Sequence, residues 1–352
     1  MTVPGWPVAF RGSHAVAAGL ITRDRLRGPR FQRLLPDVYG RACPGPPDLL
    51  LRSLAAYRLV EGHGVLSGYS AATMLDAACA PRLSVPAEVT VVGGGLRGRP
   101  GLVVHRDTLL PDEIMLVGDV RCTTPLRTAF DLARRPDRDD GVVAVDRLAN
   151  RHRFAPDRVE ELCARHPGRR GVTRIPGVLA LTTPYSGSPM ETRIRLLIVA
   201  AGLPCPEVQW VVQDVAARTA IWLDLAWPEL MIGIEYEGGV HTEPGRVLRD
   251  IGRHTRLVDR GWAIYRYTKL DVHGERDRIV AELTRARRTR LRSAGFRAVK
   301  PAERKLTPQW RRSCGRPGGP SRARRRRPRH RGSSTSGATA TAAPGSTARA
   351  RR

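Results

Sequence analysis

Two short stretches, Ala220-Ile-Trp-Leu-Asp-Leu-Ala226 and Met231-Ile-Gly-Ile-Glu-Tyr-Glu237, decide the fold of the C-terminal half of this 352-residue chain. Both are rich in apolar and β-branched residues, and the tetrapeptide between them has the composition of a turn. They therefore predict two strands joined as a hairpin. Side chains alternate between the two faces of a strand, so Gly233, Glu235 and Glu237 are expected on one face.

The length of the turn predicts how the two strands pair. If residues 227–230 form a four-residue hairpin loop, Gly233 lies opposite Asp224, and Glu235 is the diagonal neighbour of Asp224 on the same face. Diagonal neighbours have Cα atoms roughly 7–8 Å apart. The two carboxylates could therefore reach a shared ion, and the small Gly233 would leave room for it.

Carboxylates gathered on one hairpin face repel one another and take up protons unless a cation joins them. Asp224, Glu235 and Glu237 form such a set. Hard divalent ions prefer oxygen ligands, so we expect Mg²⁺, or Mn²⁺ in its place, and no small-molecule cofactor. The alternative is a solvated polar face on an edge hairpin, which needs no ion.

A helix is expected before these strands. Ser188-Pro-Met-Glu191 has serine at the N-cap, proline at N1 and glutamate three residues after the cap, which is the pattern of a capping box. The helix should end at Gly202. On this pattern alone, Glu191 is explained as a capping residue.

The segment after the strands adds candidate side chains. His241 follows Glu237 by four residues and is placed to hold or transfer a proton, although a lone histidine is more often structural. A helix over Arg246–Arg260 and a strand over Trp262–Thr268 come next. Arg253 on that helix could pair with a site carboxylate or a phosphate, or face solvent.

Residues 1–60 contain two short helical patterns, His14–Gly19 and Thr22–Leu26, followed by a basic, strand-like stretch at 37–41. This order is compatible with a winged helix-turn-helix and also with a plain packing module. Residues 61–175 indicate a mixed α/β region, including a helix with Thr124 as N-cap and Pro125 at N1.

Charge is spread unevenly along the chain, whose net charge is +27. Residues 297–352 carry 17 Lys and Arg against one acid and lack apolar periodicity, so a disordered basic tail is expected. The preceding residues carry the remaining +11. A basic excess favours nucleic acid as a partner over a membrane. A GC-rich genome, which encodes arginine often, would also produce such an excess.

The six cysteines are scattered, without a C-x-x-C pair or a nearby Cys/His cluster, so neither zinc nor a disulfide framework is indicated. No apolar stretch is long enough to span a membrane, and the first residues lack the core of a signal peptide. We therefore expect a cytoplasmic protein.

The C-terminal half resembles a known family. A helix glutamate, a strand aspartate and a Glu-x-Glu strand are followed by Gly and His. The pattern R-D-x-x-R-x-x-x-L-x-x-x-G-W-x-x-x-R then spans residues 249–266. This series is similar to the domain of unknown function 559, which is related to very-short-patch-repair endonucleases and has the PD-(D/E)xK nuclease fold. An αβββαβ domain is thus expected within residues 186–296.

The resemblance also implies roles. Asp224 and Glu235 would be the metal ligands, Glu191 the supporting helix carboxylate, and His241 an assisting group. Glu237 stands where many nucleases of this fold have a lysine. The nucleic-acid-binding candidates are these: Arg249, Arg253 and Arg266.

The region before residue 175 is similar to AbiEi-type antitoxins, through Leu35-Pro-Asp-Val-Tyr39, Leu66-Ser-Gly-Tyr-Ser-Ala-Ala72 and Thr124-Pro-Leu-Arg-Thr128. This similarity implies a cognate toxin as a partner besides DNA.

Two functions follow. The first is a Mg²⁺-dependent endonuclease that hydrolyses DNA phosphodiester bonds, with the ion activating water. The alternative is an antitoxin-like, DNA-binding transcriptional regulator with a degenerate nuclease-type domain, since a fold does not guarantee its chemistry.

Overall fold

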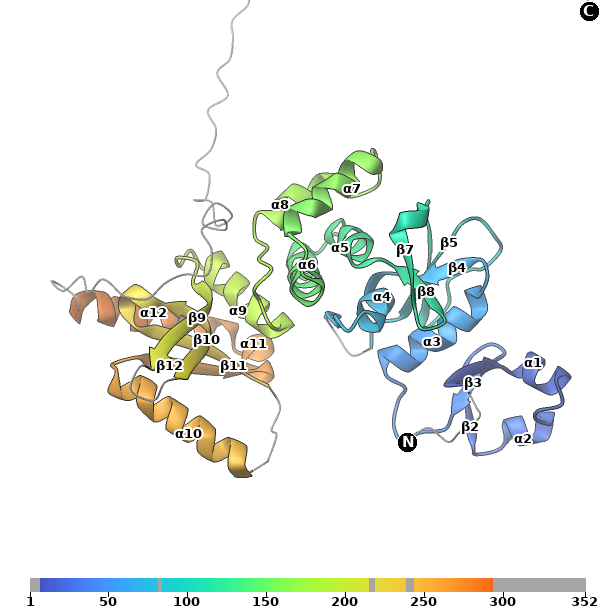
Figure 1. Ribbon diagram of the computed structural model, residues 1–352, viewed down its shortest axis with the longest axis horizontal. Helices are drawn as coiled ribbons and strands as arrows, with labels where there is room; N and C mark the ends of the chain where they lie inside the picture. The colour runs from blue at the N-terminus through green and yellow to red at the C-terminus, as the bar shows by residue number, and fades with distance from the viewer. Residues whose placement is uncertain (1–6, 82–83, 215–218, 239–243, 294–352) are drawn as a thin grey trace, which may run out of the picture. The chain divides into compact units, whose positions relative to one another are not determined.

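The computed structural model describes residues 7–81, 84–214, 219–238 and 244–293 (Figure 1). In this part of the chain the strands form sheets of three, five and four strands. The basic tail expected at 297–352 and His241 lie outside the described residues. Among the helices described, none is long and apolar enough to cross a membrane.

The first sheet has the order β1-β3-β2, with β1 (Ala9–Arg11), β2 (Phe31–Leu35) and β3 (Val38–Arg41). Two short helices, α1 (Gly12–Ala17) and α2 (Arg23–Arg27), lie between β1 and β2. A small apolar cluster that includes Phe10, Ala15, Ile21 and Leu26 holds the helices to the sheet. The two expected short helices and the strand at the expected strand-like stretch are therefore present, and β2 pairs with that strand as a hairpin.

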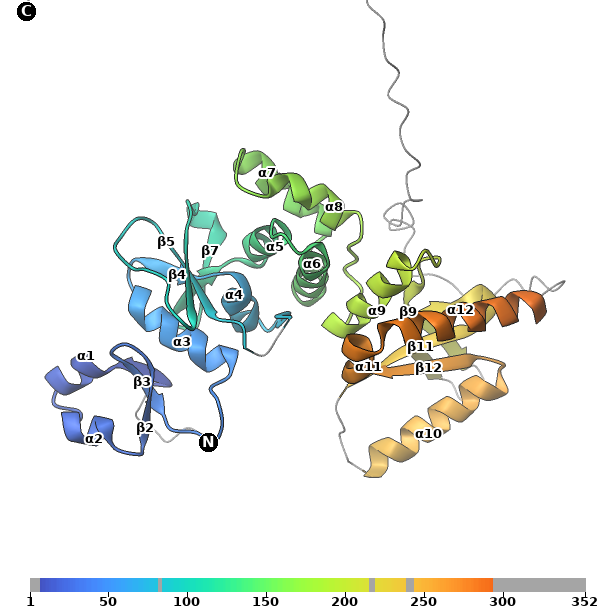
Figure 2. The ribbon, with the colours of Figure 1, turned by 180° about the vertical axis from the view of Figure 1, so that it is seen from behind.

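The middle of the chain contains a mixed five-stranded sheet with the order β6-β5-β4-β8-β7. Its elements, with the helices that pack on them, are α3 (Leu49–Val60), β4 (Gly64–Leu66), α4 (Gly68–Met74), β5 (Ala87–Val91), β6 (Leu102–Arg106), η1 (Pro111–Glu113), β7 (Ile114–Val117), β8 (Val120–Thr123), α5 (Pro125–Ala133), α6 (Arg138–His152), η2 (Pro156–Arg158), α7 (Val159–Arg165), η3 (Val172–Arg174) and α8 (Ile175–Leu179). Thr124 caps α5 and Pro125 starts it, as predicted. Figure 2 shows α4 beside this sheet, with α5 and then α6 farther from the strands.

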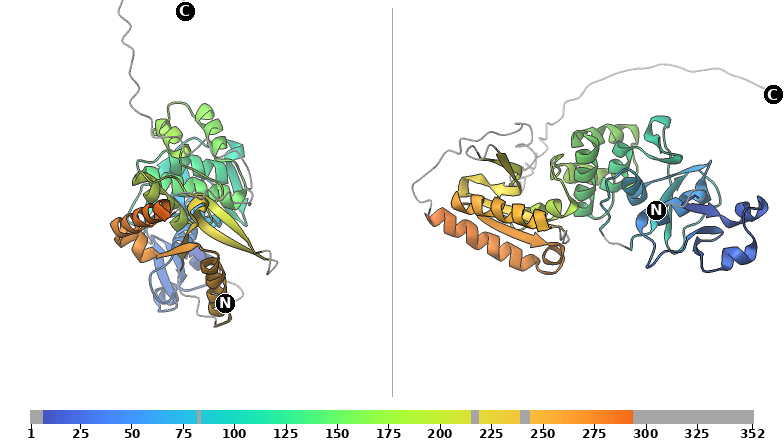
Figure 3. Two further views of the ribbon diagram at one scale, coloured as in Figure 1. Left: turned by 90° about the vertical axis from the view of Figure 1, so that its left-hand side faces the viewer. Right: turned by 60° about the horizontal axis from the view of Figure 1, so that its bottom comes forward.

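The last sheet belongs to a region with the element order α9 (Pro189–Ala200), β9 (Glu207–Asp214), β10 (Thr219–Trp227), η4 (Pro228–Leu230), β11 (Ile232–Glu237), α10 (Pro244–Asp259), β12 (Ala263–Thr268), α11 (Lys269–Gly274) and α12 (Arg276–Ser293). The order of helices and strands through β12 is the expected αβββαβ. The long β9–β10 hairpin is drawn in yellow in the left-hand view of Figure 3.

In this sheet the strand order is β12-β11-β10-β9, so the acidic hairpin β10–β11 occupies the two central positions. Apolar clusters lie on both faces. One includes Ile194 of α9 and Ile279 of α12, and the other includes Leu257 of α10. The alternative of an open edge hairpin is therefore wrong, because these strands are paired and covered on both sides.

The predicted register of β10 and β11 is also wrong. Gly233 pairs with Ala226 rather than with Asp224, because residues 228–231 form the connection, in which Met231 has the left-handed φ of +54°. The shift by two positions keeps the same side chains on the same face and brings Glu235 toward Asp224. A Cβ at Gly233 would lie 2.7 Å from Ile264 Cδ1, so this glycine makes room for the core and not for an ion.

Candidate functional site

The candidate site is built around Asp224 on β10. Its Oδ2 accepts a 2.8 Å hydrogen bond from the backbone N–H of Tyr236 on the neighbouring strand. Burial raises the pKa of Asp224 above its ordinary value, although this hydrogen bond, Arg253 and Gln209 act in the opposite direction. The carboxylate is thus fixed in place by a backbone group, and its charged form is disfavoured.

Glu191 of α9 brings a second carboxylate beside Asp224. Ser188 caps α9 by accepting a bond from the Glu191 N–H, as predicted, but the Glu191 carboxylate reaches past the cap to the N–H of Gly187, at 2.8 Å. Only 7% of Glu191 is exposed. Burial, followed by the neighbouring Asp224 charge, raises the pKa of Glu191. The Glu191 carboxylate therefore lies beside Asp224 and bonds the Gly187 N–H rather than the Ser188 N–H of the predicted capping box.

Gln209 on β9 is a site residue that the sequence did not reveal. The pairing of β9 with β10 is interrupted at Gln209, which has φ of +52°, between the pairs Leu223↔Trp210 and Leu225↔Val208. Its Nε2 donates to Glu191 Oε2 at 3.0 Å, and its side chain also hydrogen-bonds Asp224. An amide that contacts both carboxylates holds them together, and the alternation of β9 gives no sign of this.

Glu235 lies on β11 and is 7% exposed, but arginines engage it. Arg253 of α10 donates to its Oε1 at 2.5 Å, and Arg266, its neighbour on β12, lies 3.3 Å from Oε2. Burial raises the pKa of Glu235, against the effect of both arginines. Arg253 thus pairs with a site carboxylate, which is one of the three roles predicted for it.

The other predicted residues lie apart from this group or cannot be placed. Glu237 is exposed at the end of β11. Arg249 lies on α10, and its side chain is outside the described part of the structure, as is His241.

The acidic site offers a metal ion two carboxylates. Across the described ranges, no three His, Cys, Asp or Glu side chains gather closely enough to hold one. Glu191 and Asp224 fit a hard cation, because they are a buried and a half-buried oxygen donor whose negative charges disfavour each other. Glu235, in the arrangement observed, is already neutralised by Arg253 and Arg266.

A second charged cluster lies in the middle of the chain, around the buried Arg127 of α5. Its guanidinium contacts Asp107 at 3.0 Å, Glu113 at 2.5 Å and Asp131 at 3.0 Å. His166 lies 2.6 Å from the other oxygen of Glu113. Burial raises the pKa of Glu113, but the bond to His166 and the backbone N–H of Leu110, together with Arg127, hold it below its usual value. This cluster joins segments far apart in the sequence.

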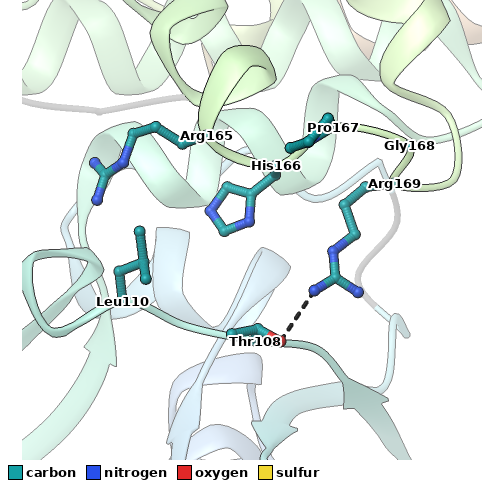
Figure 4. Close-up of a pocket in the computed structure, with 7 residues that line it drawn as sticks. All are labelled: Thr108, Leu110, Arg165, His166, Pro167, Gly168 and Arg169. Carbon is teal, nitrogen blue, oxygen red and sulfur yellow. Dashed lines mark hydrogen bonds between the residues drawn. The ribbon is translucent and has the colours of Figure 1, made fainter.

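A pocket of about 300 Å³ opens beside His166 (Figure 4). Arg165 and Arg169 lie on either side of the histidine ring, and Arg169 donates to Thr108 Oγ1 at 3.0 Å. Arg165 is paired with Asp112 at 2.6 Å. Arg165 and Arg169 have partners, and His166 faces Glu113. The residues of this pocket therefore belong to the charged cluster around Arg127.

Comparison with known proteins identifies the middle of the chain. Residues 70–181 match the AbiEi antitoxin C-terminal domain family, which confirms the similarity to AbiEi-type antitoxins predicted before residue 175. Two uncharacterized proteins of Mycobacterium tuberculosis, MT2308 from strain CDC 1551 / Oshkosh and Rv2248 from strain ATCC 25618 / H37Rv, are each 30% identical over 251 residues. The aligned residues cover 70% of this chain and 90% of each relative. The chain therefore belongs to the family of these two mycobacterial proteins, and its residues 70–181 match the AbiEi antitoxin C-terminal domain.

Proposed function

We propose that the protein is a DNA-binding regulator of the AbiEi antitoxin type. The observation that carries this proposal is the match of residues 70–181 to the AbiEi antitoxin C-terminal domain. In this chain that domain is preceded by two short helices and a β-hairpin. Such a unit is of the size and order that can place a helix in a DNA groove and a hairpin along the backbone.

Charge on this unit supports DNA as the partner. Six of its arginines are exposed, and within the described residues none of them forms an ion pair with a carboxylate. They are Arg23, Arg25, Arg27, Arg30, Arg33 and Arg41. Unpaired guanidinium groups of this kind bind phosphate oxygens, which positions a protein on duplex DNA and makes binding dependent on salt.

The test is DNA binding by the full chain in the presence of EDTA, measured by fluorescence anisotropy over a range of salt concentrations. The probes are a duplex from upstream of its own gene and a shuffled duplex of equal composition. We expect tighter binding to the first. Arg23→Gln combined with Arg27→Gln should reduce the salt slope by about 2. Arg97→Gln, which changes an exposed arginine between β5 and β6, should not. Equal affinity for both duplexes, unaffected by the variants, would contradict the proposal.

An antitoxin has a cognate toxin, and we propose a toxin as the second partner. The neighbouring genes are the place to test this. Each product should be expressed with and without this protein, and one of them should arrest growth only in its absence. Growth arrest by none of them, or arrest that this protein does not relieve, would remove the toxin from the proposal.

A second candidate function is metal-dependent hydrolysis of phosphodiester bonds. The observation that favours it is the pair of carboxylates formed by the buried Glu191 and the half-buried Asp224, whose pKa values are raised and which share Gln209. A hard divalent cation at this pair would supply a Lewis acid for hydrolysis. Asp224 and Glu191 would hold it, and Glu235 would join them only if Arg253 released it. With Glu237 at the usual lysine position, no lysine assists the attacking water.

The two candidates are separated by a thermal melt with Mg²⁺ or Mn²⁺, run beside a plasmid-nicking assay. If the C-terminal region is a nuclease, metal should raise the Tm by mass action and permit nicking. Asp224→Asn and Glu191→Gln should lose both effects, while Glu229→Gln, an exposed acid on the same hairpin, should keep them. Stabilisation without cleavage favours the regulator. If metal does not change the Tm of the wild type, and Asp224→Asn nicks plasmid DNA as the wild type does, the nuclease is ruled out.

A further inference from the structure

A second cavity, of about 340 Å³, lies on the middle sheet and shares no lining residue with the acidic site or with the pocket of Figure 4. Residues from β5, β6, α5 and the segment around η3 line it, together with Ser67 and Gly68 at the start of α4. Its volume is at the small end of the range for ligand-binding pockets. It is therefore suited to a small ligand.

Four arginines line this cavity, and two of them are already neutralised. Arg135 is bound to Glu88 at 2.5 Å, and Arg134 contacts Asp107 and Asp131. Asp131, the acid in the lining, gives its other oxygen to Arg127. The acids around the cavity are thus already paired with arginines.

The other two arginines, Arg170 and Arg174, are different. Within the described ranges, neither has a carboxylate at ion-pair distance, and Arg174 donates only to the backbone oxygen of Arg134, at 3.3 Å. Two positive charges at one cavity, without anions of their own, favour an anionic ligand.

Ser67 provides an independent observation. It lines the cavity, is 1% exposed, and its hydroxyl has no hydrogen-bond partner in the described part of the structure. It precedes α4 without capping it. Buried hydroxyl groups are nearly always hydrogen-bonded, because an unmade bond costs free energy. A ligand oxygen in the cavity would give this hydroxyl an acceptor.

The backbone beside Ser67 keeps the cavity open. Gly68 has φ of +52°, and a Cβ there would overlap the Glu88 carboxylate and lie 2.5 Å from Nη2 of Arg135. Glu88 also binds the Tyr69 N–H and His105. Glu88 consequently holds Arg135 next to Gly68, where a residue with a Cβ would overlap both side chains.

We propose that this cavity binds the phosphate group of a small ligand, either inorganic phosphate or the 5′-phosphate of a mononucleotide. Arg170, Arg174 and the Ser67 hydroxyl supply the donors. Phosphate fits better than an organic carboxylate, since Pro136 is the one purely apolar side chain among the described lining residues and little surface would bind an organic body. The site does not depend on DNA binding or on the acidic site.

The test measures the Tm of the full chain with millimolar inorganic phosphate, AMP or adenosine, at constant ionic strength in chloride. Phosphate and AMP should stabilise the wild type, and adenosine should not. If phosphate raises the Tm and AMP does not, the ligand is the free ion. If AMP raises the Tm at a lower concentration than phosphate, the ligand is the nucleotide. General stabilisation by phosphate salts would persist in all variants, so the difference between variants reports on the site.

Ser67→Ala should keep the Tm of the free protein, because its hydroxyl has no bond to lose, and should weaken phosphate binding about tenfold. Arg170→Gln with Arg174→Gln, both exposed, should weaken it further. Arg97→Gln should behave as wild type. The proposal is wrong if phosphate and AMP stabilise these variants as much as wild type, or if neither stabilises the wild type.

Discussion

Asp224 Oδ2 and the backbone N–H of Tyr236 are joined by a 2.8 Å hydrogen bond between two central strands. Side chains rarely bond to a backbone group across a strand pair, because the strands use those groups for their own ladder. Here the bond fixes the direction of a carboxylate whose charged form is disfavoured by burial. The site is therefore rigid but electrostatically unfavourable as long as it holds no cation.

Asp224→Asn should raise the stability of the metal-free protein at neutral pH, because asparagine keeps an acceptor for Tyr236 and removes the buried charge. The pKa of Asp224 is raised above 3.8, so the folded state binds the proton more tightly than the unfolded state. Wild type should thus gain stability as pH falls through the raised pKa, and the advantage of the variant should disappear there. Melts from about pH 8 to about pH 4 measure this. A constant difference at all pH values would contradict it.

Glu191→Gln and Glu191→Ala should differ. Glutamine can still accept from the Gly187 N–H and should change stability little, whereas alanine leaves that N–H without an acceptor and removes one of the two acceptors of the Gln209 amide. We expect a loss of about 1–3 kcal/mol for alanine, measured by urea unfolding. Equal losses would mean that the two hydrogen bonds of Glu191 contribute nothing to the fold.

Asp146→Ala should be among the most destabilising single changes. Asp146 on α6 is buried and accepts from Arg195, from the Thr192 hydroxyl and from the Thr183 N–H, at 2.7, 2.9 and 2.6 Å. Removing one partner of a buried pair costs about 3–5 kcal/mol. The control is Asp139→Ala, an acid in a solvent-facing pair on the same helix, which should cost less than about 1 kcal/mol. Similar values for both would contradict the role of Asp146.

Arg127→Met should leave three carboxylates without their shared cation and cost about 3–5 kcal/mol. Arg127→Lys should recover little, because one ammonium group cannot meet three carboxylates from different directions. Urea unfolding measures both, with Arg158→Met as the exposed control. Full recovery by lysine would show that charge alone matters at this position.

Deleting residues 297–352 should leave the Tm of the remaining chain nearly unchanged, since this sequence offers no periodic apolar face to bury. It should weaken binding to the shuffled duplex and lower the salt slope, because 17 Lys and Arg are removed with it. A large fall in Tm would show that the tail packs on the rest of the protein.

Much of the C-terminal region could be predicted from the sequence. The capping pattern at Ser188 and the alternation of Ile232–Glu237 are local signals, and both elements form where expected. The register could not be predicted, because it depends on Met231 adopting a left-handed conformation that ordinarily favours glycine or asparagine. Nothing in the local pattern indicates that.

The charged partners could not be predicted for a different reason. Glu235 meets Arg253 and Arg266 through the packing of α10 and the parallel pairing of β12, and Arg127 of α5 meets Asp107 and Glu113 from other segments. Gln209 needs an interrupted strand pair to reach Glu191. These contacts depend on tertiary structure, which spacing along one segment does not encode.

The pair formed by Asp146 and Arg195 bears on how such proteins are assembled by recombination. The segment that matches the antitoxin family ends at residue 181, yet the cation for its buried Asp146 is Arg195 on α9. A gene fragment cut at residue 181 would encode a buried acid without its base. In this chain, the unit that keeps the Asp146–Arg195 pair is therefore longer than the region of family similarity and includes α9.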